Sequence, residues 1–317
     1  SRALKPPEVV AAGTRARVES AIAELGYRPN ALASGLRRQR SENIIVVVPF
    51  INNPFFATVV QGIENVAHAS GYKVLLGESQ DRLERLDTYA AMLVSKEADG
   101  LILLGSLLPT VVREAVERGS RPNLRIVMAC EYFPGLQAPN VRIDNVEAAG
   151  LATDHLVQLG HRRIAHITGP VQNPLSKDRL RGFKARLARS KLKLPAEYVV
   201  RGDFSAASGY TAMQKLLTLP SRPTAVFCAN DEMAMGAVKA IREARLKVPD
   251  DLSVVGFDNI HFCEFVEPPL TTIGQPRSEI GETAMRLMLD VFNDRRAPTS
   301  VVLPHTLIVR GSTRKPK

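Results

Sequence analysis

Cysteine is scarce in this chain of 317 residues, and its three cysteines stand far apart. Cys130, Cys228 and Cys263 form no Cys-x-x-Cys pair. Cys130 and Cys228 fall in apolar segments that are expected to be buried strands, which predicts reduced thiols in a protein core. Reduced core thiols fit a cytoplasmic protein.

Long apolar runs are also missing. No stretch of 18 apolar residues occurs, so the sequence predicts no segment that spans a membrane. The first residues show no secretory signal peptide, although the chain does not begin with Met.

The motifs of common catalytic sites are absent as well. There is no Gly-x-Ser-x-Gly, no Gly-x4-Gly-Lys-Ser/Thr and no Gly-x-Gly-x-x-Gly after a strand. The adjacent carboxylates Asp250 and Asp251 stand in a polar loop and are expected to be turn residues. His155, His161 and His166 lack a metal-binding spacing such as His-Glu-x-x-His, so structural histidines are expected. The sequence thus predicts no enzyme, no metal and no cofactor.

Positive charge is what the chain has in excess. Its formal net charge is +10 and its isoelectric point is about 9.7. Residues 1–43 hold eight Lys and Arg against four Asp and Glu, a local excess of +4. This concentration is typical of nucleic-acid binding, although basic proteins are common, and the remaining +6 is spread along the chain. The length itself predicts two or three domains.

A short basic segment, 26–38 (GYRPNALASGLRR), stands out within this region. It follows an amphipathic helix expected over Thr14–Leu25, with Gly26 as its C-cap. Asn30 can cap a second helix, which is too short to be stable alone. An apolar Leu36 beside Arg37 and the following cations suits the minor groove of DNA, where a leucine can push between base pairs. The alternative is a solvated linker.

The rest of the chain alternates apolar strands with amphipathic helices. Strands are expected at 44–48, 73–76, 100–104, 125–129, 164–168, 198–201, 224–228 and 252–257. Helices are expected at 55–70, 82–97, 145–159, 177–190, 206–218, 231–244 and 277–293. Continuous short apolar strands between helices indicate parallel sheets covered on both faces. These units are too many for one doubly wound sheet, so two α/β lobes are expected.

Ligands bind open parallel sheets at the carboxyl ends of the strands, so the loops that follow strands are the candidate site. These loops are 49–56, 77–81, 144–145, 169–179, 202–204, 229–231 and 257–259. They carry aromatic side chains, carboxylates, amides and an arginine. Such a mixture is expected of a cleft for a small polar molecule with a flat face.

Several motifs, in order along the chain, resemble the LacI/GalR family of bacterial transcription regulators. They are NPFF (53–56), LGHRRI (159–164), ITGP (167–170), RLRGF (179–183), NDEMAMG (230–236), VVGFDN (254–259) and PPLTTI (268–273). The resemblance covers nearly the whole chain. It implies a two-lobed effector domain, shared with periplasmic sugar-binding proteins, behind a small helical DNA-binding headpiece. Within the family, stretches such as 247–253 and 308–314 resemble the cytidine repressor type.

The resemblance also assigns the basic beginning of the chain. Ser1-Arg2 resembles the end of a recognition helix, 14–27 the third headpiece helix, and 30–38 the hinge helix. The residues implied to contact DNA are Ser1, Arg2, Asn30, Ala33, Leu36 and Arg37. The first helix, the turn and most of the recognition helix are not in the sequence, so we expect a truncated chain that does not read base edges. Ser34 stands where the family often has Arg, which weakens the expected phosphate contacts.

The implied domains follow the family's three crossovers between lobes, near 144–149, 272–276 and 299–305. They are the headpiece remnant (1–28), the hinge helix and linker (29–42), the first lobe (43–145 with 275–300) and the second lobe (146–274 with 301–317).

The loops and the resemblance together predict the effector site. Its residues are expected to be Phe55, Phe56, Asp144, Arg179, Phe204, Asn230, Phe257 and Asp258. Most of these residues also have an alternative, purely structural role. One of Phe55 and Phe56 is expected in the core, Asp144 can be a helix N-cap, and Arg179 can lie on the surface. Phe204 can be a core aromatic and Asp258 a structural cap, while Asp231 is expected to cap its own helix.

The predicted function is an effector-controlled transcriptional regulator, a repressor, that binds operator DNA as a homodimer, with a tetramer left open. The aromatic residues favour a flat base and hence a nucleoside effector, whereas Arg179 and Asp258 suit a sugar equally. Two other classes stay open: a solute-binding transport protein, which would lack the basic segment, and an enzyme acting on nucleosides or sugars. The resemblance implies that the effector changes the angle between the lobes and the order of 30–38.

Overall fold

The computed structural model describes residues 11–25, 40–120, 124–293, 295 and 299–317. The chain falls into two units, residues 1–42 and 43–317. In the first unit, helix α1 (Ala12–Leu25) confirms the expected helix and begins two residues earlier. Leu25 of its apolar face is 80% exposed. The expected hinge helix at 30–38 lies outside the described residues.

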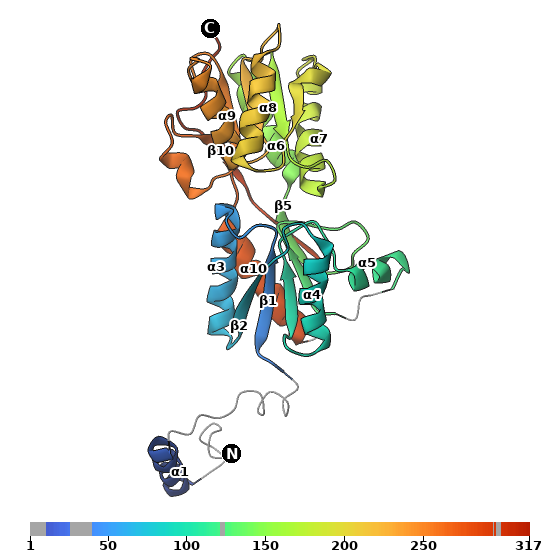
Figure 1. Ribbon diagram of the computed structural model, residues 1–317, viewed down its shortest axis with the longest axis vertical. Helices are drawn as coiled ribbons and strands as arrows, with labels where there is room; N and C mark the ends of the chain where they lie inside the picture. Colours follow the sequence, from blue (N-terminus) through green and yellow to red (C-terminus); the bar gives the residue numbers. More distant parts are fainter. Residues whose placement is uncertain (1–10, 26–39, 121–123, 294, 296–298) are drawn as a thin grey trace. The chain divides into compact units, whose positions relative to one another are not determined.

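The second unit contains two six-stranded sheets, one in each of two lobes (Figure 1). The sheet of the first lobe has the order β11-β5-β4-β3-β1-β2, and all its strand pairs are parallel. Its strands are β1 (Asn43–Val48), β2 (Lys73–Glu78), β3 (Gly100–Leu103), β4 (Ile126–Ala129), β5 (Asn140–Ile143) and β11 (Ser300–Leu303). The first lobe is completed by the helices α3 (Pro54–Ala69), α4 (Leu83–Val94), α5 (Thr110–Glu117) and α10 (Arg277–Phe292).

The sheet of the second lobe has the order β12-β10-β9-β8-β6-β7. Its strands are β6 (Ile164–Thr168), β7 (Val199–Arg201), β8 (Ala225–Cys228), β9 (Ser253–Asp258), β10 (Thr271–Gly274) and β12 (Thr306–Ile308). Only the pair β10–β12 is antiparallel among the described strands. The helices of this lobe are α6 (Asn145–Gln158), α7 (Pro174–Arg189), α8 (Ala206–Leu217) and α9 (Asp231–Glu243), with 3-10 turns η3 (Ala196–Tyr198) and η4 (His261–Glu264).

Strand β1 shows why both faces of each sheet are buried. Ile44, Val46 and Val48 pack on one face with residues of α3 and α10, such as Ile63 and Ile280. The intervening Ile45 and Val47 pack on the other face with residues of α4 and α5. Because successive side chains of a strand point to opposite faces, a continuous apolar run requires helices on both sides.

The two lobes confirm the predicted fold class, and the chain passes between them three times (Figure 1). It crosses at Asp144 between β5 and α6, at 275–276 between β10 and α10, and at 304–305 between β11 and β12. The predicted division placed 301–303 in the second lobe, but β11 pairs with β5 and belongs to the first. Sequence reasoning also missed β10, β11 and α5. Within the described part of the chain, no helix is long and apolar enough to cross a membrane.

Glycines set the distance between paired helices. A Cβ atom at Gly281 of α10 would lie 2.0 Å from the carbonyl oxygen of Val59 on α3. Conversely, a Cβ atom at Gly62 of α3 would lie 2.2 Å from the carbonyl oxygen of Ser278. The pair α8 and α9 repeats this reciprocal contact through Gly209 and Gly236. Backbone therefore packs directly on backbone, which leaves no room for a methyl group.

We predict that Gly281→Ala lowers the free energy of unfolding by about 1–3 kcal/mol, because the added methyl group forces α3 and α10 apart. Urea unfolding followed by circular dichroism measures the loss. Glu279→Ala, an exposed change on the same helix, is the control and should leave the transition midpoint unchanged. Equal midpoints for the two variants would contradict this packing.

Candidate functional site

A cavity of about 260 Å³ lies between the two lobes, where the carboxyl ends of both parallel sheets meet. Much of its wall comes from residues that follow four strands of the first lobe (β1, β2, β3 and β4) and four of the second (β6, β7, β8 and β10), and Asp258 stands at the end of β9. The lining is Pro49, Phe50, Asn53, Phe55, Phe56, Asp81, Leu104, Ser106, Leu107, Cys130, Glu131, Pro170, Gln172, Asn173, Leu175, Arg179, Phe204, Asn230, Asp258 and Gln275. The volume is near the lower end of ligand pockets, which hold about 300–1,000 Å³.

Phe55 and Phe56 form the aromatic part of the first lobe's wall. Helix α3 begins at Pro54, and Asn53 caps it by accepting a 2.9 Å hydrogen bond from the Phe55 amide. The two rings meet edge to face, with centroids 5.3 Å apart. Both residues line the cavity, although only Phe55 is almost fully buried. The expected split, one ring in the cleft and one in the core, is therefore too simple.

Arg179 of α7 is a buried cation in the second lobe's wall, with 3% of its surface exposed. Its Nε donates to Asn145 Oδ1 at 2.9 Å, and its Nη1 donates to the carbonyl oxygen of Ala229 at 2.5 Å. The guanidinium carbon lies 3.7 Å from the centroid of the Phe257 ring. Burial lowers the pKa of Arg179, and the carboxyl group of Asp258 opposes that shift. The alternative of a surface arginine is excluded by this burial.

Asp258 stands at the end of β9 with a positive φ of 114°, and it is one of the residues that line the cavity. Its Oδ1 accepts a 2.7 Å hydrogen bond from Gln275 Nε2, at the second crossing between lobes. Burial raises the pKa of Asp258, and the positive charge of Arg179 acts in the opposite direction. A carboxyl group beside a buried guanidinium can bind hydroxyls or ring N–H groups.

Phe204 and Asn230 form a connected part of the same wall. Asn230 caps α9 by accepting a 3.0 Å hydrogen bond from the Met233 amide, and its Nδ2 donates to the Phe204 carbonyl at 2.8 Å. The expectation that Asp231 caps this helix is wrong. Asp231 is instead fully buried and accepts hydrogen bonds from the Thr272 hydroxyl and the Ile260 amide.

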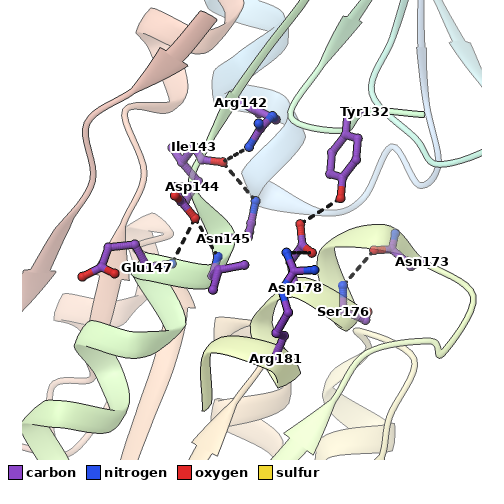
Figure 2. A network of polar contacts seen from close by, with 11 residues as sticks. Tyr132, Arg142, Ile143, Asp144, Asn145, Glu147, Asn173, Ser176, Asp178 and Arg181 are labelled. Carbon is purple, nitrogen blue, oxygen red and sulfur yellow. Dashed lines mark hydrogen bonds and ion pairs between the residues drawn. The ribbon is translucent and has the colours of Figure 1, made fainter. Parts of the chain in front are cut away.

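Two predicted site residues, Phe257 and Asp144, are not among the lining residues of the cavity. The Phe257 ring is fully buried and lies under the guanidinium of Arg179. Asp144 takes its alternative role as an N-cap, because its Oδ1 accepts hydrogen bonds of 3.0 Å from the Val146 and Glu147 amides (Figure 2). The geometry therefore supports an effector contact for neither Phe257 nor Asp144.

Sequence reasoning missed the loop that follows β4. Cys130 and Glu131 stand there and line the cavity, together with Asn173 at the start of α7 and Gln275. Asn173 lay inside a loop that the sequence selected but was not singled out. The rule that parallel strands present ligands at their carboxyl ends applies to β4 as well, and that signal could have found Cys130 and Glu131.

The loop after β4 also joins the lobes. Tyr132 Oη donates a 3.1 Å hydrogen bond to Asp178 Oδ2 on α7 (Figure 2). Arg181 holds the other oxygen of Asp178 at 2.8 Å, and the Arg142 guanidinium lies 5.1 Å from the centroid of the Tyr132 ring. Tyr132 and Arg142 belong to the first lobe and Asp178 to the second, so this contact must break when the lobes separate.

Two doubly wound lobes around a polar and aromatic cavity define a class of two-lobed ligand-binding proteins. A family described as a periplasmic binding protein-like domain matches residues 153–313. The HTH-type transcriptional repressor CytR of Escherichia coli (strain K12) is 44% identical over 315 residues, which cover 99% of this chain and 92% of that protein. The chain belongs to the LacI family of DNA-binding transcriptional regulators.

Solved structures agree with this assignment. The lac repressor dimer bound to operator and the anti-inducer ONPF matches with a TM-score of 0.88 and 30% identity, covering 99% of this chain and 94% of that one. A complex of the transcriptional regulator CelR with cellobiose matches with a TM-score of 0.76 and 32% identity, covering 98% and 94%.

The structure says less about the other predicted sites. The residues expected to contact DNA, namely Ser1, Arg2, Asn30, Ala33, Leu36 and Arg37, all lie outside the described residues. Within the described ranges, no group of three or more His, Cys, Asp or Glu residues could hold a metal ion.

We predict that Tyr132→Phe opens the lobes of the unliganded protein, because it removes a hydrogen bond to a carboxylate worth about 1–3 kcal/mol. Small-angle X-ray scattering should report a larger radius of gyration. Tyr198→Phe is the matched control, since the Tyr198 hydroxyl bonds to the Ser221 carbonyl within one lobe. Identical scattering from the Tyr132 variant and the original protein would show that this contact does not hold the lobes.

Proposed function

We propose that this chain is a repressor that binds operator DNA as a homodimer under the control of a small effector held between its lobes. The observation that carries the proposal is the cavity itself, because its wall comes from both lobes. A ligand that contacts both lobes has a different affinity for each arrangement of them, which is what a switch requires. Since its proposed partner is operator DNA, we place the protein in the cytoplasm.

We propose a nucleoside as the effector. Phe55 and Phe56 on one side and Phe204 on the other can hold the faces of a flat base. Arg179, Asn230 and Asp258 offer donors and acceptors for ribose hydroxyls. A sugar is the alternative, supported by the cellobiose complex of the related regulator CelR.

The link to DNA is proposed to run through residues 29–42, which precede β1. Leu36 and Arg37 would contact the minor groove, and the spacing of two such segments in a dimer would follow the angle between the lobes.

Exposed apolar side chains on both lobes support a second copy as the partner. Leu75 and Leu76 of the edge strand β2 are 37% and 46% exposed, and Phe262 and Phe265 around η4 are 52% and 70% exposed. Apolar residues gathered on one protein surface commonly mark an interface. A mate that contacts both lobes would sense the angle between them.

We predict that nucleosides raise the melting temperature of the protein more than sugars do. A ligand at 100 times its Kd adds about 2.7 kcal/mol to the free energy of unfolding. A thermal-shift screen with cytidine, uridine, adenosine, guanosine, ribose and cellobiose measures this. If only the sugars stabilise the protein, the proposed effector class changes from a nucleoside to a sugar. Chemical conversion of a stabilising compound, followed by chromatography, would favour an enzyme over a regulator.

We predict that Phe265→Glu converts the dimer into monomers, because it buries a charge in the proposed interface. Sedimentation velocity at micromolar concentration measures the mass. Val111→Glu is the control, since Val111 is a 47% exposed apolar residue on α5, on the flank away from β2 (Figure 1). A protein that sediments as a monomer before any substitution would contradict the proposed dimer.

A further inference from the structure

Glu131 has a buried carboxyl group in the cavity wall. Only one of its two oxygens has a hydrogen-bond partner among the described residues. Glu131 follows β4, and only 6% of its surface is exposed. Its Oε1 accepts a 2.9 Å hydrogen bond from Asn173 Nδ2, which belongs to the other lobe. Its Oε2 has no hydrogen-bond partner among the described residues. Buried polar atoms are rarely left without a partner, so this oxygen needs one that the chain does not supply.

The charges around Glu131 decide which form of its carboxyl group is present. Burial raises its pKa to about 7, while the hydrogen bond from Asn173 and the charge of Arg179 act against that shift. Asp81, after β2, and Asp178, on α7, raise the pKa further. Cys130 beside it and Asp258 across the cavity complete the titratable groups that share this wall. Two donors of Arg179, its Nε and Nη1, are bonded to Asn145 and to the Ala229 carbonyl rather than to Glu131.

We propose that Glu131, as a neutral acid, reads the edge of the effector's base. Its O–H would donate to a ring acceptor, and its carbonyl oxygen would accept from the adjacent N–H of the same edge. This inference rests on the proposed nucleoside effector and deepens it.

The chemistry of the two forms supports this role. A neutral carboxyl group pairs with an edge that has an acceptor beside a donor, whereas a carboxylate accepts only. Cytosine and adenine present a ring nitrogen acceptor beside an amino N–H, whereas uracil and guanine present a carbonyl oxygen beside a ring N–H. The volume of about 260 Å³ suits a single-ring base on one ribose better than a purine nucleoside. The preferred class is therefore a pyrimidine nucleoside.

Calorimetric titration of the protein with cytidine at pH 6 and pH 8 tests the proposal. We expect affinity about tenfold lower at pH 8, because ionisation of Glu131 near pH 7 removes the donor. Glu131→Gln keeps a donor and an acceptor and should bind with little pH dependence. Glu131→Leu should bind about 10–100-fold more weakly at pH 6. Glu64→Gln, an exposed change on α3, is the control and should behave as the original protein.

A second probe keeps the test independent of how the leucine variant folds. 3-Deazacytidine lacks the ring acceptor, so the original protein should bind it at least about tenfold more weakly than cytidine. Equal affinity for the two compounds would overturn the proposal. So would a pH profile that persists in Glu131→Gln, because the titrating group would then be another one, such as Asp258.

The failure of this proposal can be told from failure of the proposed effector class. If the original protein binds ribose or cellobiose but neither cytidine nor uridine, the nucleoside effector is wrong and the role of Glu131 falls with it. If it binds cytidine and folded Glu131→Leu binds as tightly, only the role of Glu131 is overturned.

Discussion

The buried charge of Arg179 is the constraint on which the cleft depends. An uncompensated guanidinium in a protein interior costs several kcal/mol, so its surroundings must be built around it. Asn145 at the start of α6, the Ala229 carbonyl after β8 and the Phe257 ring of β9 all meet the guanidinium. One side chain on α7 thus ties together three other elements of the second lobe. The carboxyl group of Asp258 can face the cavity because this cation lies beside it.

The loop after β4 contacts both the cavity and the opposite lobe. Glu131 lines the cavity and bonds to Asn173, and its neighbour Tyr132 bonds to Asp178. Consecutive residues therefore contact the ligand space and the opposite lobe. A ligand bound at Glu131 would therefore lie one residue along the backbone from a contact between the lobes.

Much of the fold could be predicted from the sequence, because alternating apolar strands and amphipathic helices have strong periods. The strands at 44–48 and 164–168 are examples that the structure reproduces closely. Short elements such as α5 and β11 escaped, since eight and four residues carry too little pattern. Arg179, Phe204, Asn230 and Asp258 lie on the cavity, as their positions after strands suggested.

Helix capping and the burial of charged residues depend on packing between distant segments, which no local sequence pattern predicts. Asp144, Asn230 and Asp231 look alike as helix caps, and only the backbone angles decide that the first two cap and the third is buried. Burial of Glu131 likewise follows from the meeting of two lobes whose contacting residues are far apart in sequence. Charged side chains are expected at the surface, so sequence alone argues against such a position.

The glycine contacts between α3 and α10, and between α8 and α9, bear on how the molecule deforms. Helices whose backbones touch cannot slide or tilt without a clash, so we expect each lobe to resist internal strain and to move as one body. Any rearrangement must then be absorbed at Asp144, at 275–276 and at 304–305. Three crossing segments side by side oppose a twist of one lobe against the other far more than a single segment would. The easiest motion of this unit is therefore a bending of one lobe relative to the other about a single axis.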